Sequence, residues 1–143
     1  MPDQQCRPQH RLHGRSVAGL FQVSSALFAE ECGEFDLTSV QYAALVAIRE
    51  NPDVEATQLS ALIAFDQSTI GDVVARLEGK GWVVRHPSPN DRRVKLLRLS
   101  PKGMEVLRRV EPAVLRVQER LLAPLDPSNR ETMMRLLVQL ADV

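Results

Sequence analysis

The spacing of the apolar residues departs from a helical pattern in one stretch of the chain, and this departure limits the folds that the chain can adopt. From Val17 to Leu77 apolar residues recur at intervals of three and four, which is the spacing of one face of an α-helix. Between Trp82 and Leu99 two short apolar runs flank a polar turn, as they do in a β-hairpin. Helical spacing then resumes from Met104. The sequence therefore predicts a mainly α-helical fold with one small β-hairpin.

Capping signals divide the helical regions into six predicted helices. Thr38 and Thr57 are placed to cap the second and third helices, and Ser100 followed by Pro101 is placed to begin the fifth. Pro112 lies inside the fifth helix, where we expect it to kink the helix without ending it. The predicted helices cover about residues 10–31, 38–51, 57–64, 68–80, 100–124 and 126 onward, and the predicted strands cover 82–85 and 95–99.

The length and composition fit one domain. A chain of 143 residues with 44% hydrophobic and 25% charged residues can bury a core of its own. It has no apolar run of membrane-spanning length and no apolar segment of the signal-peptide type. Cys6 and Cys32 are too few for a disulfide framework or a four-cysteine zinc module. We therefore expect a cytoplasmic protein without a membrane partner or a cofactor.

The formal net charge of zero hides an uneven distribution. Residues 57–103 hold eight basic and four acidic residues, whereas residues 1–56 hold four basic and eight acidic ones. Nucleic-acid binding requires a local excess of positive charge and not a basic chain as a whole. The charge distribution therefore places a candidate DNA-binding surface on residues 57–103, over the fourth predicted helix and the hairpin.

The same region has the outline of a winged helix-turn-helix. Two predicted helices, at 57–64 and 68–80, are joined by the short turn Phe65–Gln67 and followed by the hairpin. The second of these would be the recognition helix. Its first residues are polar types that can hydrogen-bond to base edges and phosphates, and a helix N-terminus offers free N–H groups to phosphate oxygens. These residues are Gln67, Ser68, Thr69, Gly71 and Asp72.

Residues 37–103 resemble the MarR family of dimeric bacterial transcription regulators. The resemblance rests on three stretches in the family's order and spacing, which are LTSVQYAALVAI, LSALIAFDQSTIGDVVARLEGKGWVVR and PNDRRVKLLRLSPKG. It implies a single domain over residues 1–143. In this domain residues 37–103 form the winged helix-turn-helix, and residues 10–35 and 104–143 form dimerisation helices.

The resemblance also implies roles for single residues. Arg93 is the expected minor-groove residue, Arg92 a phosphate-binding or wing-stabilising residue, and Asp91 the acid that holds an arginine in place. Ser68, Thr69 and Arg76 match positions that contact the major groove and the DNA backbone. The complete predicted DNA-binding set is Gln67, Ser68, Thr69, Asp72, Arg76, Asp91, Arg92, Arg93 and Lys95.

A homodimer also follows from the apolar stripes of the first and last helices, which the winged module is too small to cover. Two recognition helices would then read half-sites roughly 34 Å apart on a pseudo-palindromic operator. We expect a non-enzymatic repressor that a small aromatic acid releases from DNA. Candidate ligand-binding residues, each of which could instead be a surface or interface residue, are Arg11, His13, Arg15, Ser16 and Tyr42.

Two alternatives for the signal remain open. Cys6, His10 and His13 would share a helix face and could bind a metal if the first helix reached back to Cys6, although Pro8 argues for a helix start near itself. Cys6 or Cys32 could instead sense an oxidant. A winged-helix adaptor that does not bind DNA is a further alternative, but it would not require the basic hairpin. No motif of the common enzyme classes is present.

Overall fold

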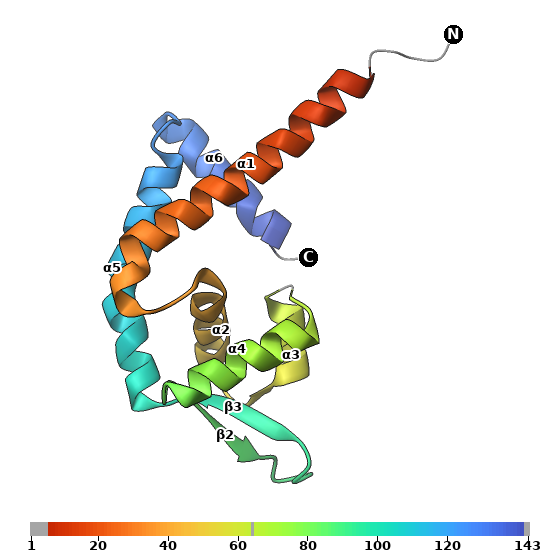
Figure 1. Ribbon diagram of the computed structural model, residues 1–143, viewed down its shortest axis with the longest axis vertical. Coiled ribbons are helices and arrows are strands. Elements are labelled where there is room, and N and C mark those ends of the chain that lie inside the picture. Colours follow the sequence, from red (N-terminus) through yellow and green to blue (C-terminus); the bar gives the residue numbers. More distant parts are fainter. Residues whose placement is uncertain (1–5, 64, 142–143) are drawn as a thin grey trace.

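The computed structural model describes residues 6–63 and 65–141, with side chains from Ser16 on. Figure 1 shows a winged module at one end of the molecule and long helices at the other. In chain order the elements are α1 (Cys6–Cys32), a 3-10 turn (Gly33–Phe35), α2 (Ser39–Glu50), β1 (Val54–Glu55), α3 (Ala56–Leu62), α4 (Gln67–Gly79), β2 (Val83–Pro87), β3 (Lys95–Leu99), α5 (Pro101–Leu122) and α6 (Pro127–Ala141). The predicted mainly α-helical fold with a hairpin wing is confirmed.

The long helices α1 and α5 lie side by side (Figure 1) and are joined by ion pairs. The carboxylate of Glu31 accepts hydrogen bonds from Arg116, at 2.8 Å, and from Arg120, at 2.9 Å. Arg120 also donates to Glu30 at 2.8 Å. The two arginines hold the pKa of Glu31 below its ordinary value. These contacts fix the C-terminal half of α1 on α5, while the N-terminal half of α1 extends away from the rest of the chain (Figure 1).

One core joins the winged module to α5. Its fully buried side chains come from the end of α1, from α2, α3, α4, the sheet and α5, and the largest are Leu45, Ile48, Leu59, Ile70, Leu77, Leu97 and Leu107. Tight packing of these apolar side chains is the main source of stability for a domain of this size. The core therefore fixes the orientation of α4 relative to the sheet and to α5.

The sheet has three antiparallel strands in the order β1-β3-β2, so the wing is larger than the predicted hairpin. Val54 of β1 lies opposite Leu97 of β3, and Val83 of β2 lies opposite Leu99. A strand of two residues is too short to show the alternation by which strands are recognised in a sequence. The sequence pattern therefore did not predict β1, and β2 begins one residue later than predicted.

The helix starts test the capping predictions. Thr38 caps α2 by accepting from the backbone of Gln41, and Ser100 caps α5 by accepting from Gly103, so both predictions are confirmed. The prediction for Thr57 is wrong, because the N-cap of α3 is Glu55. Gln58 completes this turn by accepting from the backbone N–H of Glu55 at 3.1 Å.

Pro8 and Pro112 both lie within helices. α1 begins at Cys6, so Pro8 falls in its first turn. The helix tolerates proline there, because a missing N–H in the first turn breaks no intrahelical hydrogen bond. Pro112 lies inside α5 and does not end it, as predicted. Within the described residues no helix combines the length and the apolar character that a membrane crossing requires.

A glycine allows the tight approach of α5 to the base of the wing. A Cβ atom added at Gly103 would lie 2.1 Å from the carbonyl oxygen of Trp82, which is backbone and cannot move aside cheaply. We expect Gly103→Ala to lower the free energy of unfolding by about 1–3 kcal/mol, as overpacking does. Urea unfolding followed by the fluorescence of Trp82, the single tryptophan, measures this change.

The matched control is Gly71→Ala in the middle of α4, where an added Cβ would meet no atom within 4 Å. Because alanine is the better helix former, this variant should be more stable than the wild type by up to about 1 kcal/mol. Equal stabilities of the two variants would contradict the close approach at Gly103.

Candidate nucleic-acid interface

An aspartate caps the predicted recognition helix, α4. Asp66 accepts hydrogen bonds from the backbone N–H of Thr69, at 2.8 Å, and from the Thr69 hydroxyl, at 2.7 Å. These bonds hold the pKa of the Asp66 carboxyl below its ordinary value. The sequence places Asp66 in the turn between the two helices, and in the structure Asp66 is the N-cap of α4. Because the Thr69 hydroxyl donates to Asp66, it is available to a further partner only as an acceptor.

The outward face of α4 follows from its buried face. Ile70, Val74 and Leu77 are fully buried, so the residues on the opposite side point to solvent. Of the predicted contacts on this helix, Gln67, Ser68, Asp72 and Arg76 are exposed and Thr69 is partly buried. The helix is thus held by its apolar face and presents polar side chains outward.

Asp91 and Arg93 shape the tip of the wing. The Arg93 guanidinium donates to both carboxylate oxygens of Asp91, at 3.1 and 3.2 Å, and the Arg93 backbone N–H donates to the same group at 3.0 Å. The guanidinium lowers the pKa of Asp91. The Arg93 side chain is nevertheless 91% exposed. The fork therefore orients the guanidinium without burying it, which leaves three of its five N–H donors for a partner.

A second carboxylate anchors the base of the wing. Asp53 accepts from Arg98 at 2.6 Å through both oxygens and from His86 Nε2 at 2.8 Å. It lies in the left-handed region at φ 66° in the turn after α2, and Arg98 lowers its pKa. Its partners lie 33 and 45 positions away, so only the pairing of β1 with β3 and of β3 with β2 brings the three residues together. Sequence reasoning missed this cluster, which offers no local signal.

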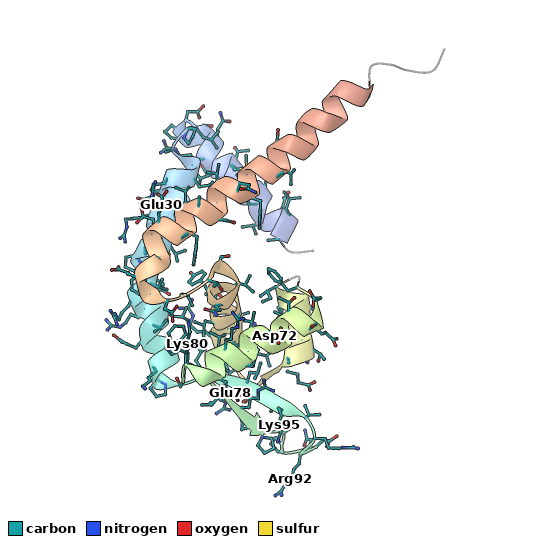
Figure 2. All side chains as sticks on the ribbon, in the orientation of Figure 1. Glu30, Asp72, Glu78, Lys80, Arg92 and Lys95 are labelled. Carbon is teal, nitrogen blue, oxygen red and sulfur yellow. The ribbon has the colours of Figure 1, made fainter. Side chains whose placement is uncertain are left out.

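Half of the basic residues of the winged module are neutralised within the chain. Lys80, Arg85, Arg93 and Arg98 form ion pairs with Asp36, Glu78, Asp91 and Asp53. Among the side chains that the structure describes, the other four have no acidic partner. They are Arg76, Arg92, Lys95 and Lys102. Figure 2 shows Arg92 at the free end of the wing and Lys95 on the wing nearby. The wing therefore carries exposed positive charge that no carboxylate of the described chain compensates.

A cavity of about 650 Å³ lies where α1, α2 and α4 meet. Its walls include Phe28 and Ala29 of α1, Thr38 at the start of α2, and the cations Arg76 and Lys80. The predicted DNA contact Arg76 thus lines a cavity on the α1 side of α4. The spacing of the residues in the sequence gave no sign of this cavity, because its walls come from three separate elements.

Lys80 is the most constrained cation at this cavity. Its ammonium donates to the backbone carbonyl of Asp36 and lies 3.2 Å from the Asp36 carboxylate. It also lies 4.6 Å from the centre of the Trp82 ring, within the range of a cation–π contact. Lys80 therefore links the end of α4 to the turn between α1 and α2.

Two of the predicted ligand-binding residues, Tyr42 and Ser16, do not line this cavity. Tyr42 is half-buried on α2, with its ring 6.2 Å from that of Phe28, and it is not part of the cavity wall. Ser16 is exposed on α1 and is also absent from the wall. The side chains of Arg11, His13 and Arg15 lie outside the described residues.

The alternative sensing residues have little structural support. The backbone of α1 reaches Cys6, but the side chains of Cys6, His10 and His13 lie outside the described residues. In the part of the chain whose side chains are described, no group of three His, Cys, Asp or Glu could hold a metal ion. Cys32 is fully buried, and this burial raises the pKa of its thiol. A protonated, inaccessible thiol is a poor target for an oxidant.

The fold and the site together define a winged helix-turn-helix protein of the DNA-binding class. The MarR family model matches residues 37–95. The transcriptional regulator HosA of Escherichia coli O111:H- is 32% identical over 117 residues, which cover 82% of this chain and 85% of HosA. The chain therefore belongs to the MarR family of non-enzymatic, DNA-binding transcriptional regulators.

Two further relatives are similar over much of the chain. The predicted transcriptional regulatory protein for the hcr operon of Thauera aromatica is 38% identical over 99 residues, which cover 69% of this chain and 60% of that protein. The transcriptional repressor NicR of Pseudomonas putida is 28% identical over 129 residues, which cover 90% of this chain and 82% of NicR.

Solved structures agree with this assignment. PcaV of Streptomyces coelicolor is 32% identical, with a TM-score of 0.76 over 90% of this chain and 94% of PcaV. A mutant MarR from E. coli, solved in complex with operator DNA, is 26% identical, with a TM-score of 0.81 over 89% of this chain and 91% of that protein. BpsR of Bordetella bronchiseptica, whose DNA binding is regulated by 6-hydroxynicotinic acid, is 25% identical, with a TM-score of 0.84 over 91% and 93%.

The Asp66 cap gives a pH prediction. Because folding lowers the pKa of Asp66, its stabilising effect is present at neutral pH and is lost as the pH falls below about 4, through the folded-state pKa. Asp66→Asn keeps a cap acceptor for the Thr69 N–H but cannot ionise. We expect Asp66→Asn to have a lower Tm than the wild type at pH 7, and this difference to shrink as the pH falls from 5 to 3.

Thermal unfolding followed by circular dichroism across this range measures the difference. Asp66→Ala, which removes the acceptor altogether, is the control and should be the less stable variant at pH 7. A Tm difference between wild type and Asp66→Asn that stays constant with pH would contradict the proposed role of the ionised carboxylate.

Proposed function

We propose that the protein is a homodimeric repressor that binds a pseudo-palindromic operator and releases it when a small aromatic carboxylate binds. The exposed, uncompensated positive charge of the wing beside the polar face of α4 is the observation on which the proposal rests. A helix of this width fits the major groove, and an exposed arginine on a hairpin can reach the adjacent minor groove. The operator complex of the MarR mutant and the repressor name of NicR support the proposal.

Arg93 is the proposed minor-groove residue. Its fork with Asp91 restricts the guanidinium before DNA arrives, so less side-chain entropy is lost on binding. Arg92, Lys95 and Lys102 have no acidic partner among the described side chains, and we assign them to phosphate contacts. Gln67, Ser68 and Thr69 stand at the N-terminus of α4, where the helix dipole also favours a phosphate.

A second copy of the chain is the proposed partner of the long helices. Val17 and Phe21 on α1 are 71% and 72% exposed, and Leu140 on α6 is 70% exposed. Leu115 of α5 and Val138 of α6 are exposed to a similar degree. Apolar side chains concentrated in this way on the terminal helices are typical of an interface, and a symmetric pair of chains would bury them.

The cavity between α1, α2 and α4 is the proposed effector site. Arg76 and Lys80 supply positive charge, while Phe28 and Ala29 supply an apolar wall, so the cavity suits a small aromatic anion. A carboxylate bound there competes with Asp36 for Lys80. Because Lys80 directly follows α4, a change in this ion pair alters the position of the recognition helix. The regulation of BpsR by 6-hydroxynicotinic acid supports this class of effector.

Removal of the Arg93 side chain should weaken operator binding. We expect Arg93→Ala to lower affinity for a 30-base-pair duplex that the wild type selects from a random-sequence library. Loss of one positive charge from the interface should also reduce the steepness of the plot of log K against log salt by up to about 0.9. Fluorescence anisotropy at several salt concentrations measures both values, and sedimentation of the complex should show two chains per duplex.

Arg108→Ala is the matched control. Arg108 is also exposed and also forms a fork with a carboxylate, that of Glu105, but it lies on α5 and not on the wing. This variant should bind as the wild type does. Unchanged binding by Arg93→Ala at every salt concentration would refute the wing assignment, and a complex with one chain per duplex would refute the homodimer.

Lys80 should determine the response to the effector. We expect benzoate, salicylate or 6-hydroxynicotinate to raise the Tm of the wild type, and the corresponding neutral amides to have no effect, because only an anion pairs with Lys80. Lys80→Met should lose this rise in Tm. Lys102→Met, which removes a lysine outside the cavity, is the control and should keep it. A Tm rise that persists in Lys80→Met would place the anion elsewhere.

A further inference from the structure

Small side chains surround Asp72 on the outward face of α4. Ser68, Gly71, Asp72 and Ala75 follow one another at helical spacing, and all four are exposed. An added Cβ at Gly71 would meet no atom within 4 Å, so this part of the helix surface is open. The opposite face is fully buried in the core. Asp72 is therefore exposed beside small side chains on the outward face of α4.

Asp72 differs from the other acids of α4 and the wing. Asp66 accepts from Thr69, Asp91 accepts from Arg93, and Glu78 lies 3.3 Å from Arg85. The Asp72 carboxylate has no hydrogen-bond or ion-pair partner among the described side chains. Between residues 66 and 95, Asp72 is therefore the one acid without a hydrogen-bond or ion-pair partner among the described side chains.

The nearest candidate cation on the same helix does not neutralise Asp72. Arg76 lies four positions further along α4, a spacing at which an aspartate and an arginine often pair. In the structure Arg76 instead lines the cavity shared with α1 and α2 and forms no ion pair with Asp72. The carboxylate therefore stays free on the face that we assign to the major groove.

A free carboxylate against DNA is unfavourable unless a donor meets it. Phosphates repel it, and in the major groove guanine presents O6 and N7, thymine presents O4, and adenine presents N7 beside its amino group. Cytosine presents the N4 amino group, with no acceptor of its own beside it. A carboxylate that is buried at the interface without a donor has a high desolvation cost. The difference in binding free energy between a site with cytosine and a site with another base is therefore large.

We propose that Asp72 accepts a hydrogen bond from the N4 amino group of a cytosine in each half-site and so sets the base preference there. Asp72 then contributes more to the discrimination between bases at that position than to the overall affinity for DNA. The inference rests on the operator binding proposed above and adds to it a base-reading residue and the base that it reads.

In vitro selection from a random 30-base-pair duplex library tests the proposal. The wild type should require a cytosine at one position of each half-site, and any other base there should weaken binding about tenfold or more. Asp72→Ala should lose the preference at that position while keeping the rest of the selected sequence. Asp72→Asn should change the preference to adenine, because an amide pairs with adenine N6 and N7.

Glu78→Ala is the control, because it removes the same charge from an exposed site on α4 where the acid already has a partner. It should select the wild-type sequence. Two results would overturn the proposal. One is an unchanged preference in Asp72→Ala, and the other is a uniform gain in affinity by Asp72→Ala for all sequences, which would mean that Asp72 only repels phosphates. If the wild type selects no sequence at all, the operator binding fails instead.

Discussion

The burial of one face of α4 is the constraint from which the other features of the structure follow. Ile70, Val74 and Leu77 are fully excluded from water, between α2, α3 and the sheet. This packing fixes the rotation of the helix about its axis, and the rotation decides which side chains face outward. The polar outward face and the cavity beside Arg76 are both consequences of that one orientation.

Carboxylates then determine which cations of the winged module are paired within the chain. Asp53 anchors the base of the wing through Arg98 and His86, and Asp91 orients Arg93 at its tip. These paired cations give shape to the wing. Arg92 and Lys95, which have no acidic partner among the described side chains, leave net charge for a polyanion. Because exposed ion pairs contribute little stability, we interpret these pairs as positioning devices.

Local sequence signals predicted most of the fold. Helical spacing and the caps Thr38 and Ser100 located α2 and α5, and the polar turn located the wing. Local signals did not identify the N-cap where a second possible acceptor lay nearby in the sequence. The N-cap of α4 is Asp66, and that of α3 is Glu55. They also failed for β1, whose two residues become a strand only by pairing with β3.

The order of residues along the chain was enough to establish the class of fold and the family, and to predict a set of residues that could meet DNA, because periodicity, capping and charge clusters are encoded locally. Which of those residues are free was settled by the packing of the folded chain. Lys80 and Arg98 are paired with acids far along the chain, and Arg76 lines a cavity that three helices form. Ion pairs and cavities depend on distances between elements, and those distances are set by the shared core.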